Sequence, residues 1–172
     1  MLVMGILNVT PDSFADGGRH HEFDAAVKRG LEMIAEGVDI IDVGGESTRP
    51  GADRVSQEEE IARTIPVITE LAKHGATISI DTMRASTARA AVKAGAAMIN
   101  DVSGGLADDA MLQTAAELKV PYIAMHWRGQ SKDMNSKAVY GDVVNEVIAE
   151  LNERIEAALD AGIAKDKLII DP

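Results

Sequence analysis

Short apolar runs alternate along this chain with longer stretches of helical spacing, and polar or glycine residues follow each apolar run. The residues at the ends of these runs are Asn8, Gly44–Arg49, Asp81, Asn100, His126 and Asp171. Parallel strands joined by helical crossovers place their carboxyl ends at one edge of a sheet. The alternation therefore predicts a (β/α) barrel in which these side chains converge on one mouth.

The runs and the helical spacing also predict where the elements lie. Strands are expected near 2–7, 38–43, 76–80, 97–101, 120–125 and 167–171. Helices are expected near 24–36, 57–73, 84–94, 108–118 and 141–161. The helix at 57–73 opens with the capping-box pattern Ser56-Gln57-Glu58-Glu59. The strands read as continuous apolar runs, which is typical of a parallel sheet covered by helices.

This order predicts one domain over residues 1–172, an α/β fold of the (β/α)8 TIM barrel family. A closed eightfold barrel needs ~250 residues. The chain has 172 residues, and its sixth expected strand ends at Asp171-Pro172. We therefore expect a barrel truncated after the sixth strand and incomplete at the C-terminus. An open doubly wound sheet is the alternative, although the sequence contains neither G-x-G-x-x-G nor G-x-x-x-x-G-K-[ST].

Composition and charge narrow the class of protein. The net charge is −11, and because a phosphate backbone requires a basic face, we expect no nucleic-acid partner. The chain has no cysteine, which excludes disulfides and thiolate chemistry. No run approaches the ~20 apolar residues of a membrane span, and the first residues lack the basic start of a signal peptide. We expect a cytoplasmic protein without a membrane partner.

The first two strand ends lead into loops with chemistry of their own. Asn8 ends the first strand, where its amide oxygen could ligate a hard cation such as Mg²⁺. The same segment also reads as a polar turn. The second loop, residues 44–51, combines tandem glycines with Arg49, whose guanidinium matches phosphate or carboxylate. The alternative for Arg49 is an ordinary surface arginine, and the residues alone do not decide between the two interpretations.

Three further strand ends carry Asp81, Asn100 and Asp171. Two carboxylates and an amide can read a flat heterocycle along its edge, because they accept from ring N–H and amino groups. The alternative is that these residues cap the helices that follow, a common role of Asp and Asn. Three of them at corresponding strand ends favour a site. A lone His126 is more often structural, and the acidic run at 58–60 is assigned to a helix N-terminus.

Six motifs together carry a resemblance to a known family. They are N-V-T-P-D-S-F at 8–14, D-V-G-G-E-S-T-R-P-G at 42–51, S-I-D-T at 79–82, N-D-V-S-G-G at 100–105, M-H at 125–126 and D-P at 171–172. From residue 2 to residue 172 the chain resembles the dihydropteroate synthases of the pterin-binding (β/α)8 family. The resemblance implies that p-aminobenzoate condenses with 6-hydroxymethyl-7,8-dihydropterin pyrophosphate. The products would be 7,8-dihydropteroate, a folate precursor, and pyrophosphate.

The resemblance also implies a role for each matching residue. The pterin would be bound by Asp81, Asn100, Met125 and Asp171, and the p-aminobenzoate loops would contribute Ser13, Phe14, Thr48 and Pro50. The catalytic groups would be Asp81, Asp12 and Arg49, and the metal ligand Asn8. The cofactor implied is Mg²⁺, which would act on the pyrophosphate. Sulfonamide drugs would compete with p-aminobenzoate.

The chain also departs from the family pattern. Trp127-Arg128 stands where the family usually has Met-Gln after the histidine, so the role of His126, Trp127 and Arg128 stays open. The family continues past Asp-Pro into further substrate-binding residues and the helices of its homodimer, so we expect little or no catalysis from residues 1–172 alone. Two other functions remain: a pterin-binding methyltransferase that serves a corrinoid, and a non-catalytic pterin-binding module. The complete loops at 8–14 and 44–51 argue against the methyltransferase.

Overall fold

The computed structural model describes residues 1–10, 18–47 and 51–172, with residues 18–21 described by their backbone alone. The described residues include six strands, all parallel to their neighbours. These strands are β1 (Met4–Asn8), β2 (Ile40–Gly44), β3 (Ile78–Asp81), β4 (Met98–Asp101), β5 (Tyr122–Met125) and β6 (Leu168–Asp171). Each lies within one or two residues of the strand expected from the sequence, which confirms the strand assignments.

The order of the strands in the sheet is the order of the strands in the chain, β1-β2-β3-β4-β5-β6. A doubly wound sheet reverses its strand order at a switch point, and helices then cover both faces. No reversal occurs among the described strands. Because each crossover is expected to have the same right-handed sense, the helices accumulate on one face of the sheet. The doubly wound alternative is therefore wrong, and the arrangement is that of a (β/α) barrel wall.

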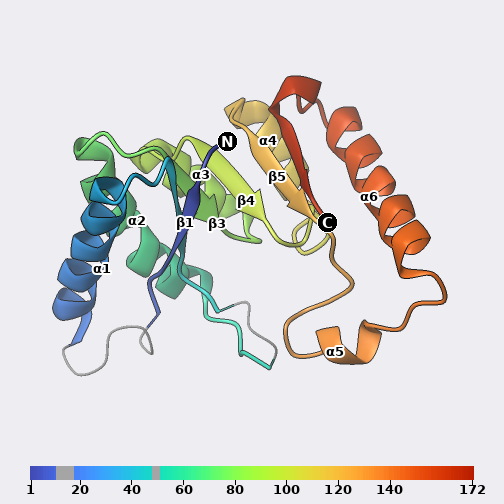
Figure 1. Ribbon diagram of the computed structural model, residues 1–172, viewed down its shortest axis with the longest axis horizontal. Helices are drawn as coiled ribbons and strands as arrows, with labels where there is room; N and C mark the ends of the chain where they lie inside the picture. The colour runs from blue at the N-terminus through green and yellow to red at the C-terminus, as the bar shows by residue number, and fades with distance from the viewer. Residues whose placement is uncertain (11–17, 48–50) are drawn as a thin grey trace.

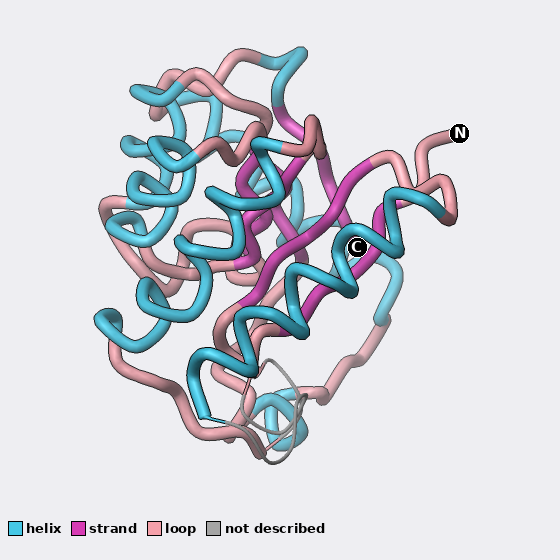
Figure 2. Tube along the Cα trace, turned by 90° about the vertical axis from the view of Figure 1, so that its left-hand side faces the viewer, coloured by secondary structure: helices cyan, strands magenta, loops and turns pink. Residues whose placement is uncertain are grey.

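The helices form an outer layer on this wall. They are α1 (Gly18–Ala35), α2 (Gln57–Lys73), α3 (Ala85–Ala94), α4 (Met111–Leu118), α5 (Met134–Lys137) and α6 (Val143–Asp160). Helices α1 to α4 contact one another in sequence order, and α6 packs on β5 and β6. Figure 1 shows the strands running between these helices, with α5 below their lower ends. Most of the helices lie on one side of the strands in Figure 2.

Side chains alternate between the two faces of the sheet. The face under the helices is apolar, and residues such as Val43, Ile80 and Ile99 are fully buried there. The opposite, interior face carries Asn8, Asp42, Gly44, Ser79, Asp81, Asn100, Met125 and Asp171. The expectation of continuous apolar strands is thus wrong at positions such as Asp42 and Ser79, although the interior face also carries apolar residues such as Ile40 and Ile123.

Several helix boundaries differ from those expected. Helix α1 begins at Gly18, whereas the expected helix began near residue 24. The short helix α5 was not expected. One of the two hydrogen bonds of the expected capping box is confirmed: Ser56 Oγ accepts from the backbone N–H of Glu59 at 3.2 Å. Among the helices described, none combines the length and the apolar composition that crossing a membrane requires.

Candidate functional site

A single row of register partners crosses four strands at their carboxyl ends. Asn8 pairs with Gly44, Gly44 with Asp81, and Asp81 with Asn100. Partners in a parallel register point to the same face, so Asn8, Asp81 and Asn100 all project from the interior face. The convergence expected for Asp81 and Asn100 follows directly from this register.

Gly44 leaves room for the side chains on both sides of it. A Cβ atom at Gly44 would lie 3.3 Å from Asp81 Oδ2 and 3.6 Å from Asn8 Oδ1. The two oxygens therefore approach the same point, from β3 on one side and β1 on the other. A side chain larger than hydrogen at Gly44 would stand between them, which gives this glycine a physical role in the site.

Met125 and Asp171 continue the interior face on the last two strands. Asn100 pairs with Ile123, and two residues further along β5 Met125 pairs with Asp171. Two residues along a strand return to the same face, so both side chains share the face of Asp81 and Asn100. Asp171 is exposed, and its carbonyl accepts from the backbone N–H of His126 at 3.0 Å. Asp81, Asn100 and Asp171 thus lie on one face at one end of the sheet.

The helix-capping interpretation of Asp81 and Asn100 is wrong. Helix α3 has Arg84 at its N-cap, with no side-chain cap bond. The backbone N–H of Ala85 is instead accepted by Asp108 Oδ2 at 2.8 Å. Helix α4 has Ala110 at its N-cap, again without a side-chain cap bond. Asp81 and Asn100 are therefore available to face the mouth of the barrel.

Asp42 orients the amide of Asn100. The Nδ2 group of Asn100 donates to Asp42 Oδ2 at 2.9 Å. Asp42 lies two residues before Gly44 on the interior face and is only 4% exposed. Since a carboxylate accepts only from the NH₂ side of an amide, this bond leaves Asn100 Oδ1 free to accept elsewhere. Sequence analysis did not assign a role to Asp42, although a carboxylate within an apolar run was a visible signal.

Burial raises the pKa of two carboxylates on the interior face, Asp42 and Asp81. Burial, followed by the negative charge of Asp42, raises the pKa of Asp81 to about 8. Burial also raises the pKa of Asp42 above its ordinary value. Among the described residues, no Lys or Arg side chain pairs with Asp42 or Asp81. A ligand that donates hydrogen bonds or carries positive charge would relieve this repulsion.

We expect the free energy of unfolding to decrease as pH rises because of Asp81. The unfolded chain releases this proton near the ordinary aspartate pKa of 3.8, whereas the folded chain keeps it until about pH 8. Between these values the folded state binds more protons, so the free energy of unfolding decreases as pH rises. From about pH 6 to about pH 8 the wild type should lose about 1–2 kcal/mol more than Asp81→Asn, measured by urea denaturation. Equal losses in the two proteins would contradict the assignment.

His126 and Arg128 take part in contacts with helix α6. His126 Nε2 lies 2.7 Å from Glu150 Oε2, and Arg128 Nη2 donates to Glu146 Oε2 at 2.7 Å. The guanidinium carbon of Arg128 lies 3.9 Å from the centre of the Tyr140 ring. These contacts attach the end of β5 to α6, which supports the structural interpretation of His126.

Some expected site residues lie outside the described part of the chain. Asp12, Ser13, Phe14, Thr48, Arg49 and Pro50 belong to this set. Their assigned roles stay predictions. Sequence analysis also missed Glu60, which was assigned to a helix N-terminus but is 1% exposed. The spacing of Glu60 with Thr64, Val67 and Leu71 on the buried face of α2 was the available signal.

A parallel barrel wall with acceptor side chains at its strand ends defines an α/β barrel protein with a candidate small-molecule site at the carboxyl mouth. A family model described as pterin binding enzyme matches residues 4–172. The chain belongs to this family.

Known relatives have the same sequence pattern and fold. The dihydropteroate synthase of Mycobacterium leprae is 52% identical over 171 residues, which are 99% of this chain and 60% of that protein. The Xanthomonas albilineans dihydropteroate synthase with 4-aminobenzoic acid superposes with a TM-score of 0.91 at 51% identity, over 99% of this chain and 60% of that one. The Yersinia pestis enzyme with a sulfonamide drug gives 0.91 at 42% identity, over 99% and 62%. The chain thus spans about 60% of the length of these relatives.

Proposed function

We propose that the full-length protein containing this chain is a dihydropteroate synthase. It would join 6-hydroxymethyl-7,8-dihydropterin pyrophosphate to p-aminobenzoate and release pyrophosphate. The observation that carries the proposal is the interior row of Asn8, Asp81 and Asn100, whose polar groups gather at the carboxyl ends of three strands. Membership of the pterin binding enzyme family and the named relatives support the same function.

Asp81, Asn100 and Asp171 would recognise the pterin. Its ring N–H and amino groups are donors, and the three side chains present carboxylate or amide oxygens on one face. Asp42 supports this role, because it occupies the Nδ2 group of Asn100 and leaves Oδ1 to accept from the ligand. Met125 shares the interior face, where a polarisable thioether suits packing against a flat ring.

The same carboxylates suit the charge that develops in the reaction. The bond from the hydroxymethyl carbon to the pyrophosphate oxygen breaks, and its electron pair leaves with pyrophosphate. The positive charge left on carbon is delocalised over the pterin, and Asp81 and Asp171 stabilise it electrostatically. The amine lone pair of p-aminobenzoate then forms the new C–N bond, and the amine releases a proton.

Asn8 would ligate Mg²⁺ together with the pyrophosphate. Its amide oxygen lies near Asp81 Oδ2 around Gly44, so the local donors are oxygens, which Mg²⁺ prefers. Within the described ranges, no three His, Cys, Asp or Glu side chains gather closely enough to hold a metal ion. Mg²⁺ commonly uses one or two protein ligands and completes its shell with substrate phosphates and water. When bound, the ion supplies Lewis-acid stabilisation to the departing pyrophosphate.

The two loops at the mouth would form the p-aminobenzoate side of the site. In this proposal Ser13, Phe14, Thr48 and Pro50 line that pocket, and Asp12 and Arg49 act in catalysis. The binding of 4-aminobenzoic acid by the Xanthomonas albilineans relative supports the substrate, and the Yersinia pestis complex supports sulfonamide competition. The homodimer, the cytoplasmic location and the low activity of residues 1–172 alone stay predictions.

The proposal is tested by incubating the full-length protein with pterin pyrophosphate, p-aminobenzoate and Mg²⁺. We expect dihydropteroate and pyrophosphate in equal amounts, with no product when either substrate is omitted. Pterin binding in calorimetry without product would contradict the synthase and favour a non-catalytic module. Methyl transfer to a corrinoid protein, without dihydropteroate, would favour the methyltransferase.

We expect Asp42→Ala to weaken pterin binding by about tenfold, because the lost hydrogen bond frees the amide of Asn100 to turn. Asp42→Asn is the matched control, since its amide oxygen can still accept from Asn100 Nδ2 and should restore most of the affinity. Calorimetric titration with the pterin measures both variants. Wild-type affinity in Asp42→Ala would show that Asp42 does not orient Asn100.

A further inference from the structure

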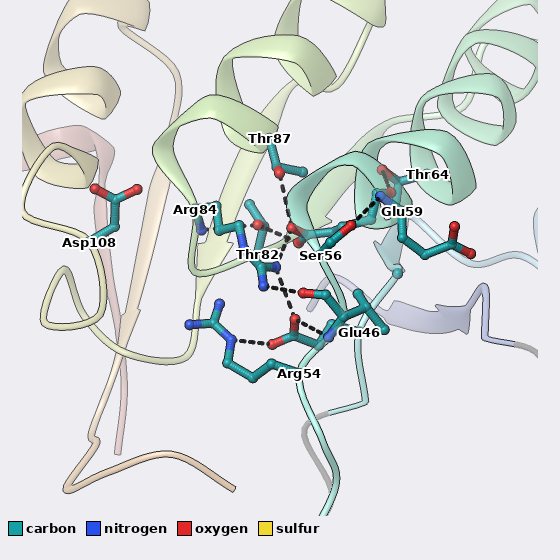
Figure 3. Close-up of polar contacts among 12 residues, drawn as sticks. Glu46, Arg54, Ser56, Glu59, Thr64, Thr82, Arg84, Thr87 and Asp108 are labelled. Carbon is teal, nitrogen blue, oxygen red and sulfur yellow. Dashed lines mark hydrogen bonds and ion pairs between the residues drawn. The ribbon is translucent and has the colours of Figure 1, made fainter.

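A cluster of charged side chains lies beside the site, on the side of the sheet that the helices cover. It consists of Glu46, Arg54, Glu60, Thr82, Arg84 and Thr87, and is called the Arg84 cluster below (Figure 3). Its two carboxylates are nearly inaccessible, with Glu46 7% and Glu60 1% exposed. Charged groups are seldom buried so completely without a specific set of partners.

Arg84 joins the two carboxylates. Its Nη1 group donates to Glu60 Oε2 at 2.6 Å and to Glu46 Oε2 at 2.9 Å. Its Nη2 group donates to the backbone carbonyl of Val55 at 2.6 Å. One planar guanidinium therefore contacts three separate points of the chain, which a point charge such as ammonium could not reproduce.

Glu46 links the two ends of the loop between β2 and α2. It follows the tandem glycines at the start of this loop, and it accepts from Arg54 Nε at 2.8 Å and from the backbone N–H of Val55 at 3.2 Å. Arg54 and Val55 lie at the other end of the loop. The Arg84 cluster thus holds both ends of the segment from residue 46 to residue 55 together.

Glu60 links these two loop ends, through Arg84, to the strand end that carries Asp81. Thr82, the residue after Asp81, donates to Glu60 Oε1 at 2.6 Å, and Thr87 on α3 donates to Glu60 Oε2 at 2.9 Å. Close packing also restrains the start of the loop, beside Glu46. A Cβ atom at Gly45 would lie 2.8 Å from Thr64 Cγ2, so the loop begins directly against α2.

Stability alone does not account for this arrangement. Buried ion pairs cost desolvation, and replacing them with apolar side chains is often neutral or stabilising. What the cluster provides is a fixed arrangement of two segments: the two ends of the loop between β2 and α2, at Glu46 and Val55, and the end of β3 with Asp81. In the proposed function these two segments bind the two different substrates.

We propose that Arg84 and Glu46 are positioning residues that hold the two ends of the loop between β2 and α2 beside the strand end of Asp81, an arrangement that the use of p-aminobenzoate requires. The inference rests on the proposed function, which assigns that loop to the arylamine pocket. Disturbing the cluster should impair use of p-aminobenzoate and leave pterin binding intact, because the pterin contacts lie on the interior face of the sheet.

The test compares Arg84→Lys with Arg89→Lys in the full-length protein. Lysine at position 84 keeps the positive charge beside the buried carboxylates but cannot reach Glu46, Glu60 and Val55 together. We expect a KM for p-aminobenzoate about tenfold higher, with the pterin Kd within about twofold of wild type. Arg89 lies on the same helix but is exposed and pairs with Glu117 at the surface, so its variant should behave as wild type.

Glu46→Gln and hydrogen exchange keep the test decisive if Arg84→Lys folds poorly. Glutamine at position 46 retains one acceptor, and it should give a smaller rise in the same KM. Both variants should speed amide exchange at residues 51–56, while exchange in β3 stays unchanged. A parallel loss of pterin affinity and p-aminobenzoate affinity would indicate a general structural role and overturn the proposal.

The wild-type control separates this inference from the proposed function. A full-length protein that forms no dihydropteroate overturns the proposed function and with it the substrate assigned to the loop. An active wild type whose Arg84→Lys variant keeps its KM for p-aminobenzoate overturns the positioning role alone.

Discussion

Replacing Asp81 with asparagine should lower kcat/KM of the full-length protein by about 10²–10³-fold. The side chain keeps its shape and one acceptor oxygen, so the loss measures the ionised carboxylate, the form that a hydrogen-bond donor or a cation bound beside it favours. The carboxylate would accept a hydrogen bond from the pterin ring and would stabilise the cation formed when pyrophosphate leaves. Asp81 is the residue best placed for both, because its carboxylate stands between Asn8 and Asn100 in the register row.

The control for this experiment is a carboxylate at the opposite end of the sheet. Asp166 is exposed and precedes β6, so Asp166→Asn makes the same replacement of a carboxyl group by an amide without reaching the carboxyl ends of the strands. Steady-state rates with each substrate varied separately give kcat and KM for both variants. If Asp81→Asn remains within about threefold of the control, the charge of Asp81 is not used in the reaction.

Loss of structure would not explain a low activity of Asp81→Asn. The pKa of Asp81 is raised to about 8 by burial and by the charge of Asp42, so ionisation of this group destabilises the folded state. The asparagine variant should therefore be at least as stable as the wild type at alkaline pH. A stable but slow enzyme is the expected combination.

The largest loss of stability should come from Asp101→Asn. Asp101 is the last residue of β4 and is fully buried, and its Oδ1 accepts from the backbone N–H and the hydroxyl of Ser103 at 2.8 and 2.7 Å. Its Oδ2 accepts from the N–H of Gly105 at 2.8 Å and from the hydroxyl of Tyr122 at 2.7 Å. An amide replaces one of these acceptors with a donor, so a buried backbone N–H loses its partner, and the hydroxyl that shared the same oxygen has to turn and accept instead. We expect a loss of about 2–4 kcal/mol in urea denaturation.

A graded series identifies the cause of this loss. Tyr122→Phe removes one of the four donors and should cost about 1–1.5 kcal/mol. Asp109→Asn, at an exposed position in the same connection between β4 and α4, should change stability by less than about 0.5 kcal/mol. The series would fail if Asp101→Asn were no more destabilising than Tyr122→Phe, since the backbone contacts of Ser103 and Gly105 would then contribute nothing.

Much of the candidate site could be predicted from the order of residues. A polar side chain that ends an apolar run in a β–α–β sequence must lie at the carboxyl edge of a parallel sheet, whatever the details of packing. Asn8, Asp81 and Asn100 could therefore be placed together before any coordinates, and their register confirms it. The strand boundaries followed equally well, because each apolar run is short and closed by a polar or glycine residue.

Contacts between distant segments could not be predicted in this way. Glu46, Glu60 and Arg84 lie in three different segments of the chain, and each has an ordinary local interpretation as a loop, helix or surface charge. The bond from Asn100 to Asp42 spans 58 positions and depends on a strand between them. Such pairs depend on how α2 and α3 pack against the sheet, which no local pattern encodes.

The sequence by itself determined the alternation of strands and helices, the edge at which the polar residues gather, and the family. The tertiary structure alone decided that the described strands keep their order without a reversal, so that the polar strand-end residues share the face that the helices leave uncovered. It also decided which buried carboxylates are neutralised by Arg84 and which, like Asp81, retain their protons. The physical reason is that pattern depends on neighbours in the chain, whereas burial and charge pairing depend on neighbours in space.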